Sequence, residues 1–449
     1  MSSSDRHSHN PGLWSSQRTY RPFIISSLCV ALTLGFTTGA AIIFFRLLDI
    51  DLGTAWPTHT QSHGMAQILG WAGLFVMGLG FHIVPRIRNS SIKFPWPQRC
   101  VLTFMIVAII SRFLGQTVTS FSINNPLLAV SAISLALGLG IFSLFVGATL
   151  LKGRARHRLP ELWIAASTGW AIVVAGLDLM IAYRMIDSNS VIVPSAIGKL
   201  FIEAALIGFI SNFIFGISLQ VVPSFLNLPP ARLRLNGVSL VCINTGIGII
   251  ILTLAKDFSN WWLFAGVVFK TVGFLIYILS LRLYSRKMSP GKYIVNVYRR
   301  FEWYLQSAYF WLLIGGMLQV WKLIGDLYSP IGPPTSLGAP TIHVVGLGFI
   351  TIMIIGMSTR MLPMFEAALL PLHGLLDVIL ILINLSVASR LIAGIIRFDL
   401  AWTVLALSGS FGTLSITLFG LVVWKLLRRS SRQEYIELTR YKVKLKTFE

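Results

Sequence analysis

The chain has few charged residues and very few cysteines. Lys, Arg, Asp and Glu together make up 12% of its 449 residues, about half the share of an ordinary soluble domain. Hydrophobic residues make up 55%, so the composition excludes a soluble globular protein and indicates a membrane protein. Cys29, Cys100 and Cys242 are isolated. Without a C-x-x-C motif, the sequence suggests neither a disulfide framework nor covalent attachment of a c-type haem.

What the sequence does have is a series of apolar runs, each of about 20 residues and long enough to cross a bilayer as a helix. The first run is too long for the core of a signal peptide and lacks a clear cleavage site, so we interpret it as a span. We expect an all-α, polytopic membrane protein with a tail over 1–21, a twelve-helix membrane domain over 22–427 and a second tail over 428–449. The runs lie near residues 22–46, 62–86, 100–119, 126–151, 160–184, 196–223, 236–255, 260–284, 303–325, 341–363, 371–396 and 401–427.

Positive charge gathers in alternate loops, which predicts the orientation of the chain. By the positive-inside rule both termini are cytoplasmic, and we expect a multi-pass protein of the inner (plasma) membrane. The net charge of +21 then reflects topology and contact with anionic lipids rather than nucleic-acid binding. The basic loops hold Arg86, Arg88, Lys93 and Arg99, then Lys152, Arg154, Arg156 and Arg158, then Arg286, Lys287, Lys292, Arg299 and Arg300; the opposite loops hold Asp49, Asp51, Asp187, Asp257, Asp326 and Asp399.

A pattern of two glycines and a proline recurs three times. The copies lie 138 and 140 residues apart, or four spans each, which predicts three parallel four-helix repeats around an axis along the membrane normal. Such small residues suit either close helix packing or the wall of a cofactor site. The copies are Gly70, Gly78 and Pro85 in the second run, Gly208, Gly216 and Pro223 in the sixth, and Gly348, Gly356 and Pro363 in the tenth.

Two histidines fall at one depth of these repeats. His63 lies seven residues before the first glycine of its copy, and the same position in the third copy is Thr341, with His343 two residues further on. In the second copy the two positions hold Phe201 and Glu203. An imidazole in an apolar bundle needs a ligand or a hydrogen bond. The pair therefore suits the two axial positions of a haem iron, or each ring bonds a neighbouring carbonyl.

The stretch HGMAQILGWAGLFVMGLGFHIVPRI, from His63, resembles the first motif of the NnrS family of haem- and copper-containing membrane proteins. The stretch HVVGLGFITIMIIGMSTRML, from His343, resembles the late motif of that family. Both are more distantly similar to helices II and X of haem-copper oxidase subunit I. That resemblance implies a fold of twelve helices in three sets of four, with cytoplasmic termini.

The same resemblance implies that His63 and His343 are the axial ligands of a haem b. Where the oxidases place a ligand for a second haem, this chain has Thr341, and its sixth and seventh runs contain no histidine for copper. An electron-accepting haem without an oxygen-reducing centre is therefore implied, with copper binding left open. Arginines at the outer end of the eleventh run, Arg390 and Arg397, are implied to hold haem propionates. The alternative is that they snorkel to the interface.

Other polar residues inside the runs are further candidates. His59 lies four residues before His63 and could share a metal with it, although WPTHTQ is more typical of a loop or cap. His82 lies roughly 28 Å from His63 along a helix, so we expect it in the core or at a helix interface. Intramembrane ionisable residues are functional suspects, and they are Arg112, Asp178, Glu203, Lys270 and Arg360. For Glu203 we favour a structural ion pair over proton relay or copper ligation, and for Arg360 we favour snorkelling.

These patterns favour a haem-binding membrane protein of NnrS type, which transfers electrons or handles nitric oxide or a metal. Whether it is an enzyme is left open. Its expected partners are membrane lipids and an unidentified electron donor or acceptor. One alternative is a divergent catalytic subunit of a haem-copper oxidase or nitric oxide reductase, which the missing copper ligands disfavour. Another is a small-molecule or metal transporter, whose site would lie nearer the midplane.

Overall fold

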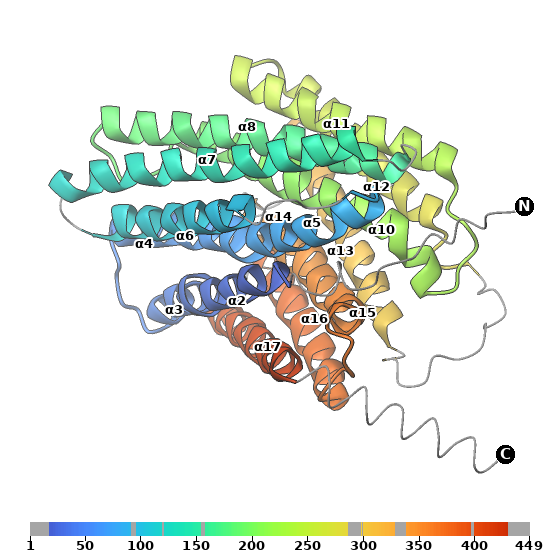
Figure 1. The fold of residues 1–449 in the computed structure, drawn as a ribbon. Helices are drawn as coiled ribbons and strands as arrows, with labels where there is room; N and C mark the ends of the chain where they lie inside the picture. Colours follow the sequence, from blue (N-terminus) through green and yellow to red (C-terminus); the bar gives the residue numbers. More distant parts are fainter. Residues whose placement is uncertain are drawn as a thin grey trace, which may run out of the picture.

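A computed structural model describes residues 18–90, 96–118, 121–153, 158–285, 298, 300–327, 338–396 and 399–429. All regular structure in these residues is helical, and twelve of the helices are long and apolar enough to cross a membrane (Figure 1). The prediction of an all-α, multi-pass membrane protein is confirmed. Most of the two expected tails and Arg397 lie outside the described residues.

The spans are numbered 1 to 12 in chain order, and four of them contain a π-helical segment. Span 1 joins α2 (Tyr20–Val30), η1 (Ala31–Gly35) and α3 (Phe36–Leu47); span 2 joins α4 (Ala55–Met65), η2 (Ala66–Gly73) and α5 (Leu74–Ile87). Span 6 joins α9 (Ser195–Glu203), η3 (Ala204–Ser211) and α10 (Asn212–Phe225); span 10 joins α14 (Gly338–His343), η5 (Val344–Thr351) and α15 (Ile352–Glu366). The single-helix spans are α6 (Trp96–Thr117), α7 (Phe121–Lys152), α8 (Leu159–Asp187), α11 (Leu233–Lys256), α12 (Asn260–Leu281), α13 (Phe301–Leu327), α16 (His373–Ile395) and α17 (Ala401–Arg428).

Spans 2, 6 and 10 form the centre of the bundle. In their most apolar windows 83–94% of residues are buried, against 28–44% in the other nine spans. The π-helical segments η2, η3 and η5 contact one another in pairs. The nine outer spans cover this centre and expose many large apolar side chains, as expected of helices that face lipid.

The three central π-helical segments recur at regular intervals. Each is eight residues long, and they begin at residues 66, 204 and 344, so 138 and 140 residues apart. A π turn holds one residue more than an α turn and changes the backbone bonding locally. Side chains five residues on take up the carbonyls there, because Ser211 Oγ donates to Leu206 at 2.6 Å and Thr351 Oγ1 donates to Gly346 at 3.0 Å.

The predicted glycines bring helices together. A side chain on any of them would strike the neighbouring span, so the close-packing interpretation is confirmed. A Cβ on Gly70 would lie 2.4 Å from Val30, one on Gly208 2.7 Å from Trp170, and one on Gly348 2.8 Å from Trp311; the second glycines Gly78, Gly216 and Gly356 meet Phe23, Trp163 and Tyr304 in the same way.

The start of span 2 corrects one prediction. Residues 56–61, WPTHTQ, are helical rather than a loop, since α4 begins at Ala55. Pro57 is the third residue of this helix, where the backbone N–H has no partner within the helix and proline is tolerated. His59 and His63 therefore lie one turn apart on one helix.

The first and tenth spans are tied together at the end of the bundle opposite to His63. Tyr20 Oη donates to Glu366 Oε1 at 2.6 Å, and Arg21 Nε donates to the same oxygen at 2.7 Å. Arg18 Nη1 lies 3.3 Å from Glu366 Oε2. The carboxylate is almost fully buried, so these donors compensate its charge and fix α2 to the end of α15.

Candidate functional site

The predicted ligands lie next to two of the central π-helical segments. His63 is near the end of α4, directly before η2, and His343 is the last residue of α14, directly before η5. Both side chains are half-buried. The two imidazoles are close enough to interact electrostatically, and Arg390 of α16 interacts with both. The structure therefore brings His63, His343 and Arg390 together.

The hydrogen bonds of the two histidines fix where each ring carries its proton. His63 Nδ1 lies 2.8 Å from the carbonyl oxygen of Gly35, and His343 Nδ1 lies 2.8 Å from that of Ala339. A carbonyl only accepts, so each Nδ1 carries the hydrogen and each Nε2 carries a lone pair. Metal-binding histidines usually show this arrangement, with one ring nitrogen held by an outer acceptor and the other on the metal. The carbonyl bonds and a role as ligand are thus compatible.

Arg390 is held between His343 and span 12. Its Nη1 lies 3.4 Å from His343 Nε2, and its Nε lies 3.3 Å from Ser408 Oγ. Ser408 also donates to the carbonyl of Ser386 at 2.7 Å, which joins α17 to α16 beside the arginine. Among the described residues, no carboxylate oxygen lies within 4.0 Å of the Arg390 guanidinium.

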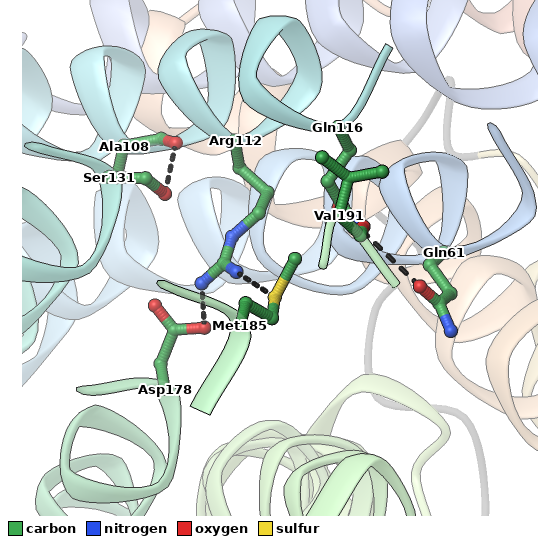
Figure 2. Close-up of polar contacts among 8 residues, drawn as sticks. All are labelled: Gln61, Ala108, Arg112, Gln116, Ser131, Asp178, Met185 and Val191. Atoms are coloured by element: carbon green, nitrogen blue, oxygen red, sulfur yellow. Dashed lines mark hydrogen bonds and ion pairs between the residues drawn. The ribbon is translucent and has the colours of Figure 1, made fainter. Parts of the chain in front are cut away.

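Arg112 provides a direct comparison. Residues 112 and 390 are 278 apart, as are the first residues of η2 and η5, 66 and 344. The helix crossings beside the two arginines also match, because Ser131 Oγ donates to Ala108 at 2.8 Å in the first. Arg112, however, forms an ion pair with Asp178 of α8, with 2.5 Å between Nη2 and Oδ1 (Figure 2). Both side chains are 2% exposed, so two suspects from the sequence neutralise each other.

A second polar contact lies one turn beyond Arg112. Gln116 Nε2 donates to Gln61 Oε1 at 3.3 Å and to the carbonyl of Val191 at 3.1 Å (Figure 2). Gln61 also exchanges two hydrogen bonds with the backbone of Val193, at 2.7 and 3.2 Å. The connection between spans 5 and 6 is thereby attached to span 2, two residues before His63.

Glu203 forms the structural ion pair that the sequence favoured. Its partner is Lys270 of α12, with 2.5 Å between Nζ and Oε1, and Lys270 also donates to Gln319 Oε1 at 2.7 Å. Lys270 is 1% exposed and Glu203 11%. Arg360, the remaining suspect, places its guanidinium 5.3 Å from the ring centre of Phe301.

His82 and His59 lie apart from this site. His82 is buried with Tyr20 and Phe365, whose ring centres are 4.5 and 4.3 Å from its own, so it is a core residue as expected. His59 Nδ1 lies 2.8 Å from the carbonyl of Ala55, and the ring lines an apolar recess of about 210 Å³ beside Phe113. No group of three or more His, Cys, Asp or Glu side chains suited to a metal occurs in the described part of the chain.

Two glycines of span 1 belong to the site and were missed from the sequence. Gly35 supplies the carbonyl that accepts from His63, and a Cβ on Gly39 would lie 2.4 Å from Cε1 of the same ring. The available signal was the spacing in GFTTG, residues 35–39, which puts both glycines on one helix face. No protein-family model matches the chain, and no curated protein shows significant similarity to it.

Proposed function

We propose that this chain is a haem-binding integral membrane protein of NnrS type, with His63 and His343 as the axial ligands of a haem b. The observation that carries the proposal is the pair of neighbouring imidazoles, each with its proton held on Nδ1 by a carbonyl. Two neutral imidazoles suit a haem iron whose other four positions are filled by the macrocycle. The haem would supply one-electron chemistry, and the protein would bind and orient it.

Space next to both histidines supports this assignment. Gly64 follows His63, and Gly346 lies one turn after His343. A Cβ added to either glycine would meet no atom within 4 Å. Both positions are only half-buried although they lie in central spans. The chain therefore leaves room beside each imidazole, where the other positions of these spans are tightly packed.

The charge on Arg390 supports the same assignment. A guanidinium inside a membrane bundle is costly unless it is paired, and Arg112 is paired with Asp178. The residue 140 positions before Asp178 is Thr38, which cannot neutralise Arg390. A haem carries two propionates, and a carboxylate is the group that a guanidinium binds best. Arg390 would therefore bind a propionate, and Arg397, outside the described residues, is a second candidate for that role.

We further propose that the twelve spans form three parallel four-helix repeats, arranged as in haem-copper oxidase subunit I. The support is the recurrence of the π-helical segments, the glycine contacts and the serine crossings at matching intervals. Three seams then separate the repeats. Arg112 and Asp178 occupy the first seam, Glu203, Lys270 and Gln319 the second, and His63, His343 and Arg390 the third. Ion pairs close the first two seams, and the third has none.

The activity that fits this site is electron transfer, or the handling of nitric oxide or a metal, without an oxygen-reducing centre. Two histidine ligands leave no open position on a haem iron, so a gas would bind only after one histidine left. In the second seam, the residue at the place of His343 is Glu203, and Lys270 already occupies its carboxylate. By the charges of the loops, the haem would lie toward the outer side of the plasma membrane.

An absorption spectrum of the purified protein tests the proposal. We expect reduced low-spin b-type bands in the wild type and their loss in both His63→Ala and His343→Ala. His82→Ala is the matched control, because it removes another buried histidine of span 2 and should leave the bands in place. Size-exclusion chromatography in detergent would show that each variant is folded. Unchanged bands in both ligand variants would rule out the assignment.

A further inference from the structure

Span 1 is interrupted where it passes His63. The π-helical segment η1 (Ala31–Gly35) divides it into α2 and α3, and Gly35 has φ −90° and ψ −106°, outside the helical region. Spans 5 and 9 have the corresponding place in the proposed repeat. There α8 and α13 run without interruption over 29 and 27 residues. The interruption is thus confined to the span that contacts a proposed haem ligand.

The interruption supplies the hydrogen bond that His63 uses. Because the Gly35 peptide leaves the helical conformation, its carbonyl oxygen is directed to a neighbour, and it accepts from His63 Nδ1 at 2.8 Å. Two threonines stabilise the same turn from within span 1. Thr37 Oγ1 donates to the carbonyl of Leu32, and Thr38 Oγ1 donates to that of Thr33 at 3.2 Å. Both bonds reach back five residues, which is the spacing of a π turn.

Gly39, one turn after Gly35, fixes the position of the ring itself. A Cβ at this position would lie 2.4 Å from Cε1 and 2.9 Å from both ring nitrogens of His63. Any larger residue would displace the ring or block the approach to Nε2. On the other side, the amide of Gln67 would lie 3.1 Å from a Cβ on Gly35. The two glycines thus form a slot that admits one imidazole in one place.

The other two seams lack all of these features. The first glycine of each repeat contacts Val30, Trp170 and Trp311 in turn, which sets the offsets from span 1 at 140 and 281 residues. At these offsets Gly39 corresponds to Leu179 and Val320. The residues at the place of His63 are Phe201 and Thr341. The slot, the π turn and the imidazole therefore occur together in one seam only.

We propose that Gly35 and Gly39, with the π turn that Thr37 and Thr38 stabilise, are the positioning residues for His63. The Gly35 carbonyl holds the proton on Nδ1, and Gly39 leaves the space that keeps Nε2 available to iron. The inference rests on the proposed haem function and extends it to span 1. It makes span 1 a determinant of the ligand field of the haem, although it contributes no ligand.

The test compares variants of span 1 by electron paramagnetic resonance and by redox titration of the purified protein. In Gly39→Ala we expect roughly tenfold weaker retention of haem, and shifted g values and midpoint potential in the haem that remains. Thr37→Val with Thr38→Val should shift both quantities in the same direction, whereas Thr37→Ser with Thr38→Ser, which keeps both hydroxyls, should behave as wild type. Gly169→Ala is the control, because a Cβ there meets nothing within 4 Å.

The possible outcomes separate this inference from the proposed function. Wild-type g values and potential in Gly39→Ala and in the double valine variant would overturn the role of span 1 and leave the haem assignment standing. If Gly39→Ala does not fold, the valine and serine pairs still decide the question, because they change no backbone position. A wild-type protein that binds no haem would overturn both proposals.

Discussion

The guanidinium of Arg390 faces the imidazole of His343, with 3.4 Å between Nη1 and Nε2. A guanidinium only donates, so this contact agrees with a lone pair on Nε2 and the proton on Nδ1. If iron took that lone pair, Arg390 would need another acceptor, and no carboxylate of the described residues is close enough to serve. The relationship therefore links the proposed ligand and the proposed propionate contact through one nitrogen atom.

Arg390 and its counterpart Arg112 should respond differently to the same substitution. Arg390→Gln should weaken haem retention about tenfold with little effect on the unfolding of the haem-free protein, because no buried carboxylate loses its partner. Arg112→Gln should keep haem affinity but lower the free energy of unfolding by about 3–5 kcal/mol, since it leaves Asp178 buried and unpaired. Haem-to-protein ratios and thermal unfolding in detergent measure both effects. Equal destabilisation by the two substitutions would make Arg390 a structural residue.

Glu203 and Lys270 should show strong thermodynamic coupling. Lys270→Met alone should cost about 3–5 kcal/mol of unfolding free energy, because a buried carboxylate is left without its cation. The double variant Glu203→Gln with Lys270→Met should recover most of that loss, and a double-mutant cycle gives the coupling energy. The haem spectrum and the metal content should stay unchanged throughout. A copper signal lost with Glu203→Gln would instead assign this carboxylate to a metal.

The loop charges predict which end of the bundle faces the cytoplasm. After removal of the three native cysteines, Asp51→Cys and Asp257→Cys should react with a membrane-impermeant maleimide added outside intact cells. Ser90→Cys and Pro230→Cys should react only after the membrane is opened, because both lie in loops of the basic side. Labelling of the second pair from outside would invert the topology and place His63 toward the cytoplasm.

The reduced protein should bind carbon monoxide poorly and should not consume oxygen at the rate of an oxidase. Two histidine ligands fill the axial positions of the proposed haem, and Thr341 stands where the resemblance would require a ligand for a second one. A carbon monoxide difference spectrum and an oxygen electrode with an artificial donor measure these properties. Rapid oxygen uptake that depends on bound copper would favour the reductase alternative over the present proposal.

Much of the fold could be predicted because it depends on local composition. The apolar run length needed to cross a bilayer is set by the thickness of its hydrocarbon core, so all twelve spans were found from the sequence. The glycines could also be assigned to close packing, since small residues serve this purpose between membrane helices. The helical start of span 2 was missed because Trp56-Pro57-Thr58 has the composition of a loop. Its proline instead occupies the first turn, where it costs no hydrogen bond.

The details of the site depended on approaches between spans that composition does not record. His63, His343 and Arg390 were selected through their resemblance to a known family, and the structure brings them together. Nothing in the sequence indicated that Gly35 would supply a backbone carbonyl, because a π turn needs only one additional residue and leaves no strong compositional mark. The partner of Glu203 was likewise undetermined, since Lys270 is 67 residues away in a different span.

The contact between Tyr20 and Glu366 has a consequence for the biosynthesis of this protein. The two residues are 346 positions apart, and a chain is made from its amino terminus. The first helix therefore enters the bilayer long before its carboxylate partner leaves the ribosome. Its final docking has to wait until the tenth helix has been inserted, so the ring of helices closes late. A chain that stops before Glu366 should hold its first helix only loosely, and limited proteolysis of such stalled products would reveal it.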